Sequence, residues 1–207
     1  GGGALENLTI EKALESFRTG KPTTVDYSLD ADAQSAVGTC GGSVMVYIEP
    51  QDVRKKLLII GAGHVGLAVA DLARYLDMHV IVVDDRTDLL DAEKFPAGTE
   101  LVPAEMNAIA DAVEIDENTY IVNVSRGSDV DILAIPAILR KNFAYMGVIG
   151  SKRRWKYTTE HLMEAGISPE SLERIKSPIG IDIKGETPHE IAVSILAEVI
   201  LAKNGTP

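Results

Sequence analysis

Three glycines and a pair of aspartates stand at the spacing of a dinucleotide-binding loop. The segment GAGHVG places Gly61, Gly63 and Gly66 in a G-x-G-x-x-G pattern, and Asp84 follows 18 residues after Gly66. In such a loop the first glycine permits a tight turn, the second lets the backbone approach a pyrophosphate, and the third lets the helix pack on the strand. An acidic residue after the next strand accepts hydrogen bonds from ribose hydroxyls. We predict that the cofactor-binding residues here are Gly61, Gly63, His64, Val65, Gly66, Asp84, Asp85 and Arg86.

Two alternatives stay open at this loop. A carboxylate at Asp84 repels the extra phosphate of NADP, which favours NAD, whereas Arg86 leaves room for NADP. The glycines can also serve packing alone, in a domain that binds no dinucleotide. His64 either faces solvent at the helix start or faces the ligand as a donor or acid–base group.

A cluster of cations forms a second candidate site. Lys152, Arg153, Arg154 and Lys156 crowd together where a helix is expected to begin, in a chain with 31 acidic and 20 basic residues. Cations are disfavoured at the positive end of a helix dipole, but a bound anion reverses that effect. We expect Ser151 to cap the helix, and we predict anion contacts from Arg126, Gly150, Ser151, Lys152 and Arg153. Solvation of the cluster, or contact of Arg154, Trp155 and Lys156 with a partner protein, is the alternative.

Motifs of other chemistries are absent from the sequence. No Tyr-x-x-x-Lys and no G-x-S-x-G occurs, which weakens an ordinary dehydrogenase and a serine hydrolase. The four histidines show no metal-ligand spacing. Cys40, the single cysteine, lies in a loop flanked by glycines and is either an idle small residue or an exposed thiol.

The elements that must position these residues alternate between strands and helices. Apolar runs at 57–61, 79–85, 99–103, 119–125 and 144–150 predict strands. Amphipathic segments between and after them predict helices, including 188–205 with Thr187, Pro188 and Glu190 as its start. Such alternation favours an α/β fold, a Rossmann-type doubly wound parallel sheet. Residues 1–51 read as a helix and two strands, a small N-terminal α+β segment, and residues 52–207 form the Rossmann-like domain.

Composition narrows the classes of function. The formal charge of −11 argues against nucleic-acid binding, and no apolar run is long enough to span a bilayer. No secretory signal is visible, so we expect a cytoplasmic protein.

Four motifs together resemble the C-terminal Rossmann domain of the XdhC/CoxI family, the xanthine dehydrogenase accessory factors. They are GAGHVG with VVDDR, SRGSDVD, YMGVIGSKRR, and SPIGIDIKGETPHEIAVSILAEVI. GGGALE and CGGSVMVYIEP resemble the latter part of that family's N-terminal domain, so that segment is expected to be partial. Ser128 departs from the T-R-G-H that the family often carries, which puts an acid–base role of that loop in doubt.

The resemblance implies an accessory or chaperone protein for maturation of a molybdenum hydroxylase. Such a protein binds molybdenum cofactor, supports its sulfuration and aids its insertion, with the client hydroxylase and a sulfur-donating desulfurase as partners, as a homo-oligomer. Cys40 is then a candidate for sulfur relay or molybdenum contact. The alternatives are an NAD-dependent oxidoreductase of a small substrate, and a nucleotide-sensing regulatory domain without chemistry.

Overall fold

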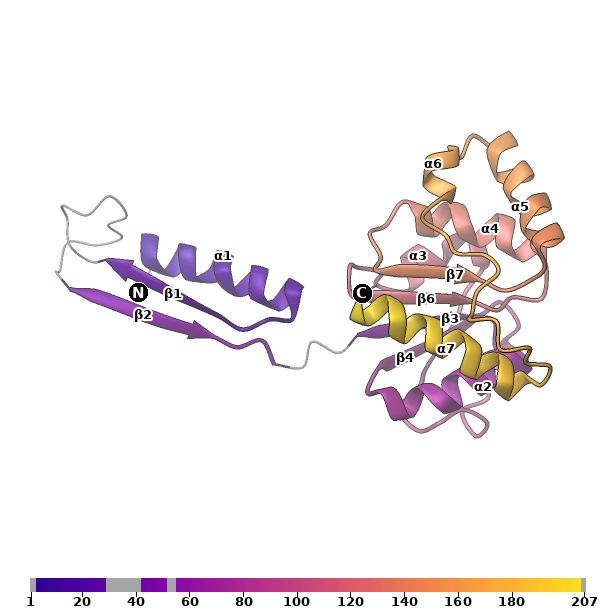
Figure 1. Cartoon of the computed structure of the whole chain (residues 1–207), viewed down its shortest axis with the longest axis horizontal. Helices are drawn as coiled ribbons and strands as arrows, with labels where there is room; N and C mark the ends of the chain where they lie inside the picture. Colours follow the sequence, from indigo (N-terminus) through magenta and orange to yellow (C-terminus); the bar gives the residue numbers. More distant parts are fainter. Residues whose placement is uncertain (1–2, 29–41, 52–54, 206–207) are drawn as a thin grey trace. The chain divides into compact units, whose positions relative to one another are not determined.

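The computed structural model describes residues 3–28, 42–51 and 55–205. The chain forms two compact units, Gly1–Val53 and Arg54–Pro207 (Figure 1). No helix among the described residues is long and apolar enough to cross a membrane.

The first unit is one helix packed on a two-stranded sheet. Helix α1 spans Ala4–Thr19 and ends at Gly20, whose positive φ of 67° suits a glycine C-cap. Strands β1 (Thr23–Ser28) and β2 (Ser43–Ile48) pair antiparallel, with Thr23 opposite Ile48. The predicted helix and two strands are confirmed. The loop with Cys40 lies outside the described residues.

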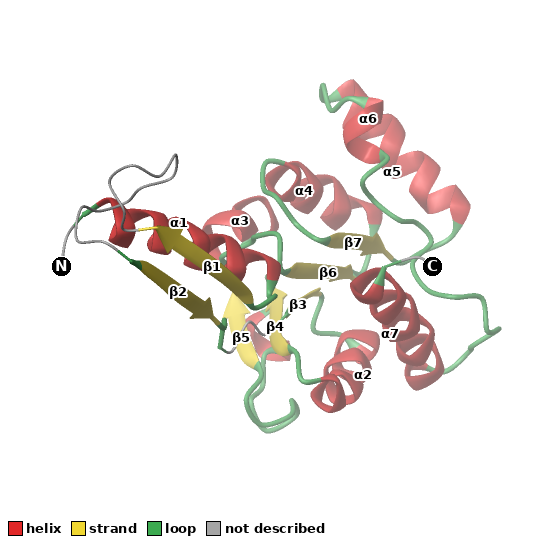
Figure 2. Cartoon of the chain, turned by 60° about the vertical axis from the view of Figure 1, so that its left-hand side comes forward, coloured by secondary structure: helices red, strands yellow, loops and turns green. Residues whose placement is uncertain are grey.

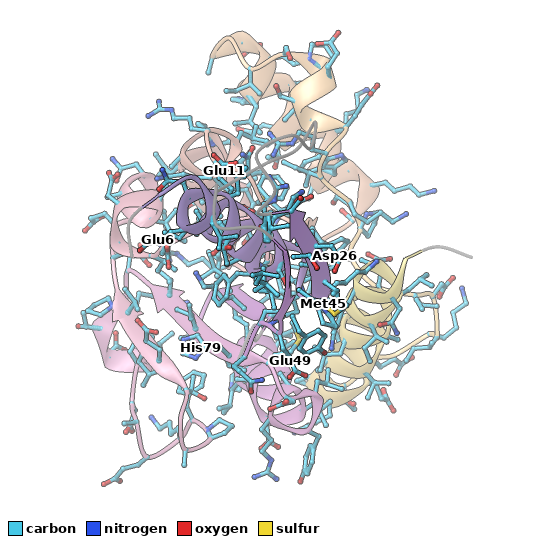
Figure 3. All side chains as sticks on the ribbon, turned by 90° about the vertical axis from the view of Figure 1, so that its left-hand side faces the viewer. Glu6, Glu11, Asp26, Met45, Glu49 and His79 are labelled. Carbon is cyan, nitrogen blue, oxygen red and sulfur yellow. The ribbon has the colours of Figure 1, made fainter. Side chains whose placement is uncertain are left out.

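Much of the apolar surface of this first unit is exposed. On α1, Ile10, Leu14 and Phe17 follow helical spacing and are 50%, 66% and 53% exposed. Asp26 and Met45 are cross-strand partners, so they project from one face of the hairpin (Figure 3), and Met45 is 71% exposed. One helix and one hairpin are too little to bury these side chains.

The second unit is built on a five-stranded parallel sheet. The strands are β3 (Lys56–Ile60), β4 (His79–Asp84), β5 (Glu100–Pro103), β6 (Thr119–Asn123) and β7 (Tyr145–Val148). Their order is β5-β4-β3-β6-β7, and every pair is parallel. The switch point therefore lies between β3 and β6, where ligands of open α/β sheets bind. All five predicted strands and the Rossmann-type fold are confirmed.

Helices cover both faces of this sheet (Figure 2). On one face, α2 (His64–Ala73) and α7 (Pro188–Asn204) pack over Leu57, Ile59 and Val82. On the other, α3 (Ile109–Ala112) and α4 (Ser128–Leu139) pack over Leu58, Ile60 and Val83. Successive side chains of a strand point to opposite faces, so one run of apolar residues supplies both cores.

The remaining helices complete the layers. Helix α5 (Lys152–Glu164) packs on α4, and α6 (Pro169–Leu172) is a single turn. Short 3-10 turns occupy Arg74–Leu76 (η1), Thr87–Leu89 (η2) and Met106–Ala108 (η3). The predicted start of α7 is confirmed: the Thr187 and Glu190 side chains form a reciprocal capping box, with Pro188 in the first turn.

Candidate functional site

The glycine loop joins β3 to α2 at the carboxyl edge of the sheet. Gly61 has φ of 111°, and a Cβ there would lie 2.8 Å from the Val124 carbonyl oxygen. A Cβ on Gly66 would lie 1.9 Å from the Gly61 carbonyl oxygen. The turn and the close helix packing therefore require glycine at these two positions, as the motif predicts.

Gly63 differs from the other two glycines. Its φ is −75°, which any residue adopts, and a Cβ there would meet no atom within 4 Å. Nothing within the described residues therefore requires a glycine at position 63. The open space beside Gly63 suits a ligand that approaches the backbone from outside, as a phosphate does at the start of a helix.

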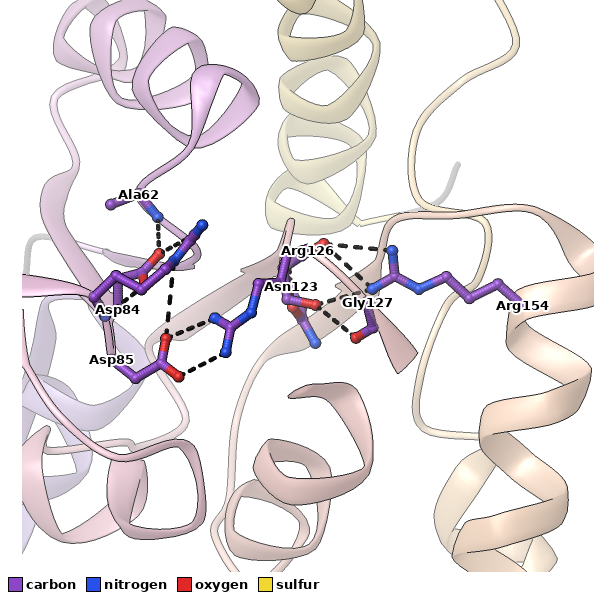
Figure 4. Close-up of polar contacts among 9 residues, drawn as sticks. Ala62, Asp84, Asp85, Asn123, Arg126, Gly127 and Arg154 are labelled. Carbon is purple, nitrogen blue, oxygen red and sulfur yellow. Dashed lines mark hydrogen bonds and ion pairs between the residues drawn. The ribbon is translucent and has the colours of Figure 1, made fainter. Parts of the chain in front are cut away.

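Asp84, at the end of β4, is 2% exposed and holds the glycine loop (Figure 4). Its Oδ2 accepts the Ala62 backbone N–H at 2.7 Å. The Arg86 backbone N–H and Nε donate to Oδ1, both at 2.9 Å, and Arg86 Nη2 donates to Oδ2 at 2.8 Å. These four donors fill the acceptor capacity of one carboxylate. Ribose contact at Asp84 stays a prediction, and it requires Arg86 to move.

Asp85 and Arg126 bridge the loops after β4 and β6. Arg126 Nη1 and Nη2 donate to the two Asp85 oxygens at 2.6 and 2.8 Å, a bidentate pair (Figure 4). The Arg126 hydrogen bond lowers the pKa of Asp85 to about 2. The residues between the bridge and Gly61 pack so closely that they leave no water-sized space. A ligand that enters here has to displace the Arg126 side chain.

A buried polar network beside this bridge was not predicted. Asp131 of α4 is fully buried, and it accepts from Asn123 Nδ2 at 2.9 Å and from the Ser125 hydroxyl at 2.7 Å. Arg154 of α5 donates to Asp131 Oδ2 from Nη2 at 2.7 Å and from Nε at 3.0 Å. The network ties the end of β6, α4 and α5 together. Its signal in the sequence was an acidic residue on the apolar face of the helix, one turn before Ile135.

This network corrects the interpretation of the cation cluster. Arg154 neutralises a buried carboxylate, so of the two alternatives left open for it, a solvated cation or contact with a partner protein, the structure favours neither. Trp155, on α5, is partly buried and packs against the core on the α4 side of the sheet. Lys156 lies 3.8 Å from Glu160 on the same helix. Ser151 accepts the Arg154 backbone N–H, which confirms the predicted cap, and the exposed Lys152 and Arg153 have no ion pair among the described residues.

The histidines are spread over the second unit. His64 and His189 line a cavity of about 340 Å³ between the starts of α2 and α7. His79 lies 3.0 Å from Glu100, and His161 bonds the Tyr157 carbonyl on its own helix. Across residues 3–28, 42–51 and 55–205, no group of three His, Cys, Asp or Glu side chains is arranged to hold a metal ion. At the carboxyl edge of the sheet, Arg86, Arg126 and Arg154 are each paired with an aspartate, and the start of α2 offers backbone N–H donors that suit an anion.

Comparison with known proteins relates the chain to one family. The model described as the XdhC Rossmann domain matches residues 57–199. The uncharacterized protein YqeB of Escherichia coli K-12 is 33% identical over 209 residues, which cover 100% of this chain and 38% of YqeB.

Two further relatives have functional names. A probable xanthine dehydrogenase component of Bacillus subtilis is 29% identical over 155 residues, covering 75% of this chain and 45% of that protein. The molybdenum cofactor insertion chaperone PaoD of Escherichia coli K-12 is 30% identical over 100 residues, covering 48% of this chain and 30% of PaoD. This chain spans less than half the length of each of these curated relatives.

Proposed function

This chain belongs to the XdhC family, and we propose that it assists the maturation of a molybdenum hydroxylase. The names of the two relatives support the proposal, because one is a cofactor insertion chaperone and the other a probable component of a xanthine dehydrogenase. Molybdenum cofactor is then cargo that the protein holds and passes on. The client is a hydroxylase of the xanthine dehydrogenase type.

The observation that carries the binding part of this proposal is Gly63. A backbone that lacks a Cβ where nothing inside the protein needs the space is suited to a phosphate or pyrophosphate from outside. The α2 N-terminus supplies N–H donors, and Arg126 supplies a cation at the rim. The same loop suits the phosphates of NAD, with Asp84 or Asp85 taking the ribose after Arg86 or Arg126 moves.

Cys40 has a proposed role that depends on the family. We infer that its thiol contacts molybdenum or relays sulfur to the cofactor, with a sulfur-donating desulfurase as the second partner. The C40A variant tests this role: client activation that equals that of the wild type contradicts it.

We also propose that the protein acts as a homo-oligomer.

The maturation role is tested in cells that express the client hydroxylase with or without this protein. We expect the client from cells without it to contain less molybdenum and to show lower activity. The variant G63V tests the loop itself, because a Cβ at position 63 meets no protein atom within 4 Å. Client molybdenum content that stays unchanged both without the protein and with G63V contradicts the proposal.

A further inference from the structure

A cavity of about 520 Å³ lies at the carboxyl edge of the sheet, beyond β7. Its walls come from the turn after β7, the start of α5, the segment before α7 and the first turns of α7. None of its lining residues belongs to the glycine loop or to the loops after β4 and β6. Its volume falls within the range of small-molecule sites, roughly 300–1,000 Å³.

The lining of this cavity combines apolar walls with cations. Five isoleucines and a proline line it: Ile149, Pro178, Ile179, Ile181, Ile183 and Ile191. Ile181 and Ile183 are 41% and 47% exposed, so part of this apolar wall is open to solvent. Three lysines and one aspartate also line the cavity, in a chain whose formal charge is −11. The cavity is therefore locally basic.

Two of the three lysine side chains are unpaired. Lys184 pairs with Asp182 at 2.7 Å, whereas the ammonium groups of Lys152 and Lys176 have no hydrogen bond or ion pair among the described residues. Lys152 is the first residue of α5, so the start of that helix, where N–H groups lack intrahelical partners, also borders the cavity. A bound anion would compensate both the lysines and the helix end.

The wall opposite α5 is held in place without a ligand. The Ile179 backbone N–H donates to the Val148 carbonyl at 3.0 Å. Ile181 N–H donates to the Ser194 carbonyl, and the Ser194 hydroxyl donates back to the Ile181 carbonyl at 2.6 Å. Gly180 permits this contact, because a Cβ there would lie 2.4 Å from the Ser194 hydroxyl. The cavity is thus preformed.

We propose that this cavity binds a phosphorylated heterocycle, at a site separate from the glycine loop. The apolar walls take the ring, and Lys152 and Lys176 take the phosphate. The assignment rests on the proposed function, because molybdenum cofactor, the cargo named there, is a phosphorylated pterin. It gives the chain two anion sites on one sheet edge, so that one phosphorylated ligand at the glycine loop and another beyond β7 need not compete.

Flavin mononucleotide is a stable fluorescent probe of this class, and its anisotropy reports binding to the full chain. We expect K152A/K176A to weaken binding about tenfold or more, and I181S/I183S to weaken it as well. Riboflavin, which lacks the phosphate, and inorganic phosphate as a competitor separate the two parts of the site. K156A is the matched control: it removes one lysine charge from the same helix, outside the cavity, and should leave binding unchanged.

Several results would overturn the site. The first is that the probe does not bind at about 1 mM, a concentration at which even weak millimolar complexes are detected. The second is that K152A/K176A and the wild type bind the probe equally well, and the third is that G63V alone abolishes binding. The last result would assign the probe to the glycine loop. Client maturation is measured separately: a chain that binds the probe through both lysines but does not support the client contradicts the proposed function and leaves the site intact.

Discussion

Arg154 shows how the partner of one residue decides its role. Its guanidinium is the only cation bonded to the buried Asp131 carboxylate among the described residues. Removing one partner of a buried pair leaves an uncompensated charge and costs about 3–5 kcal/mol. Arg153, the preceding residue, is exposed and has no such pair within the described part of the chain.

We therefore predict that R154A lowers the free energy of unfolding by about 3–5 kcal/mol, whereas R153A changes it by less than about 0.5 kcal/mol. Urea denaturation of the two variants measures the difference. The double variant R154A/D131N should recover part of the loss, because the amide carries no charge. Similar unfolding midpoints for R153A and R154A would disprove the role assigned to the network.

Arg126 controls the ionisation of Asp85. The folded-state pKa of about 2 lies below the ordinary value of 3.8, so the pair stabilises the fold fully above about pH 4 and is lost as the pH falls through 2. We predict that R126A raises the pKa of Asp85 toward 3.8, as measured by NMR titration of its carboxyl carbon. R140A, at an exposed arginine, should leave that pKa unchanged. An Asp85 pKa that stays near 2 in R126A would mean that another group holds it there.

Within the glycine loop, Gly66 is required by packing, whereas Gly63 is not. A Cβ on Gly66 collides with backbone, whereas a Cβ on Gly63 meets nothing. We predict that G66A lowers the free energy of unfolding by about 1–3 kcal/mol or more, the usual cost of overpacking, and that G63A changes it by less than about 1 kcal/mol. Thermal or urea unfolding tests both. A G63A variant as unstable as G66A would remove the argument that position 63 is kept free for a ligand.

The elements of this protein were predictable, but their side-chain partners were not. Apolar runs fix the strands because both faces of a parallel sheet are buried, and the Thr187 capping box marks the start of α7 locally. The pairs of Arg86 with Asp84, Arg126 with Asp85 and Arg154 with Asp131 depend on rotamers and on loop geometry. The spacing of residues in the sequence does not distinguish an arginine or lysine that binds a ligand from one that is already paired with a carboxylate.

At the scale of the whole molecule, the two units differ in how much they bury. The second unit has two cores on one sheet, whereas the first leaves Ile10, Leu14 and Phe17 exposed. We predict that a chain of residues 54–207 folds alone, with a cooperative urea transition and a circular dichroism spectrum of the α/β class. Loss of cooperativity would show that the Rossmann unit needs residues 1–53.

The proposal that residues 1–51 are part of an N-terminal domain belongs to the same scale. The chain spans 38% of YqeB, and one helix with a hairpin leaves an apolar helix face uncovered. That the segment is a partial domain stays a prediction. The proposed client, desulfurase and homo-oligomer are likewise proposals about the whole molecule.

The most direct measurement is the transfer of molybdenum in a purified system. The full chain is loaded with molybdenum cofactor, separated from free cofactor by gel filtration, and mixed with the apo form of its hydroxylase, and the molybdenum in each protein is then determined. We predict that molybdenum elutes with the chain before mixing and with the hydroxylase afterwards, together with hydroxylase activity. A chain that retains no molybdenum on the column, or that does not raise the activity of the apoenzyme above that reached with free cofactor, would contradict it.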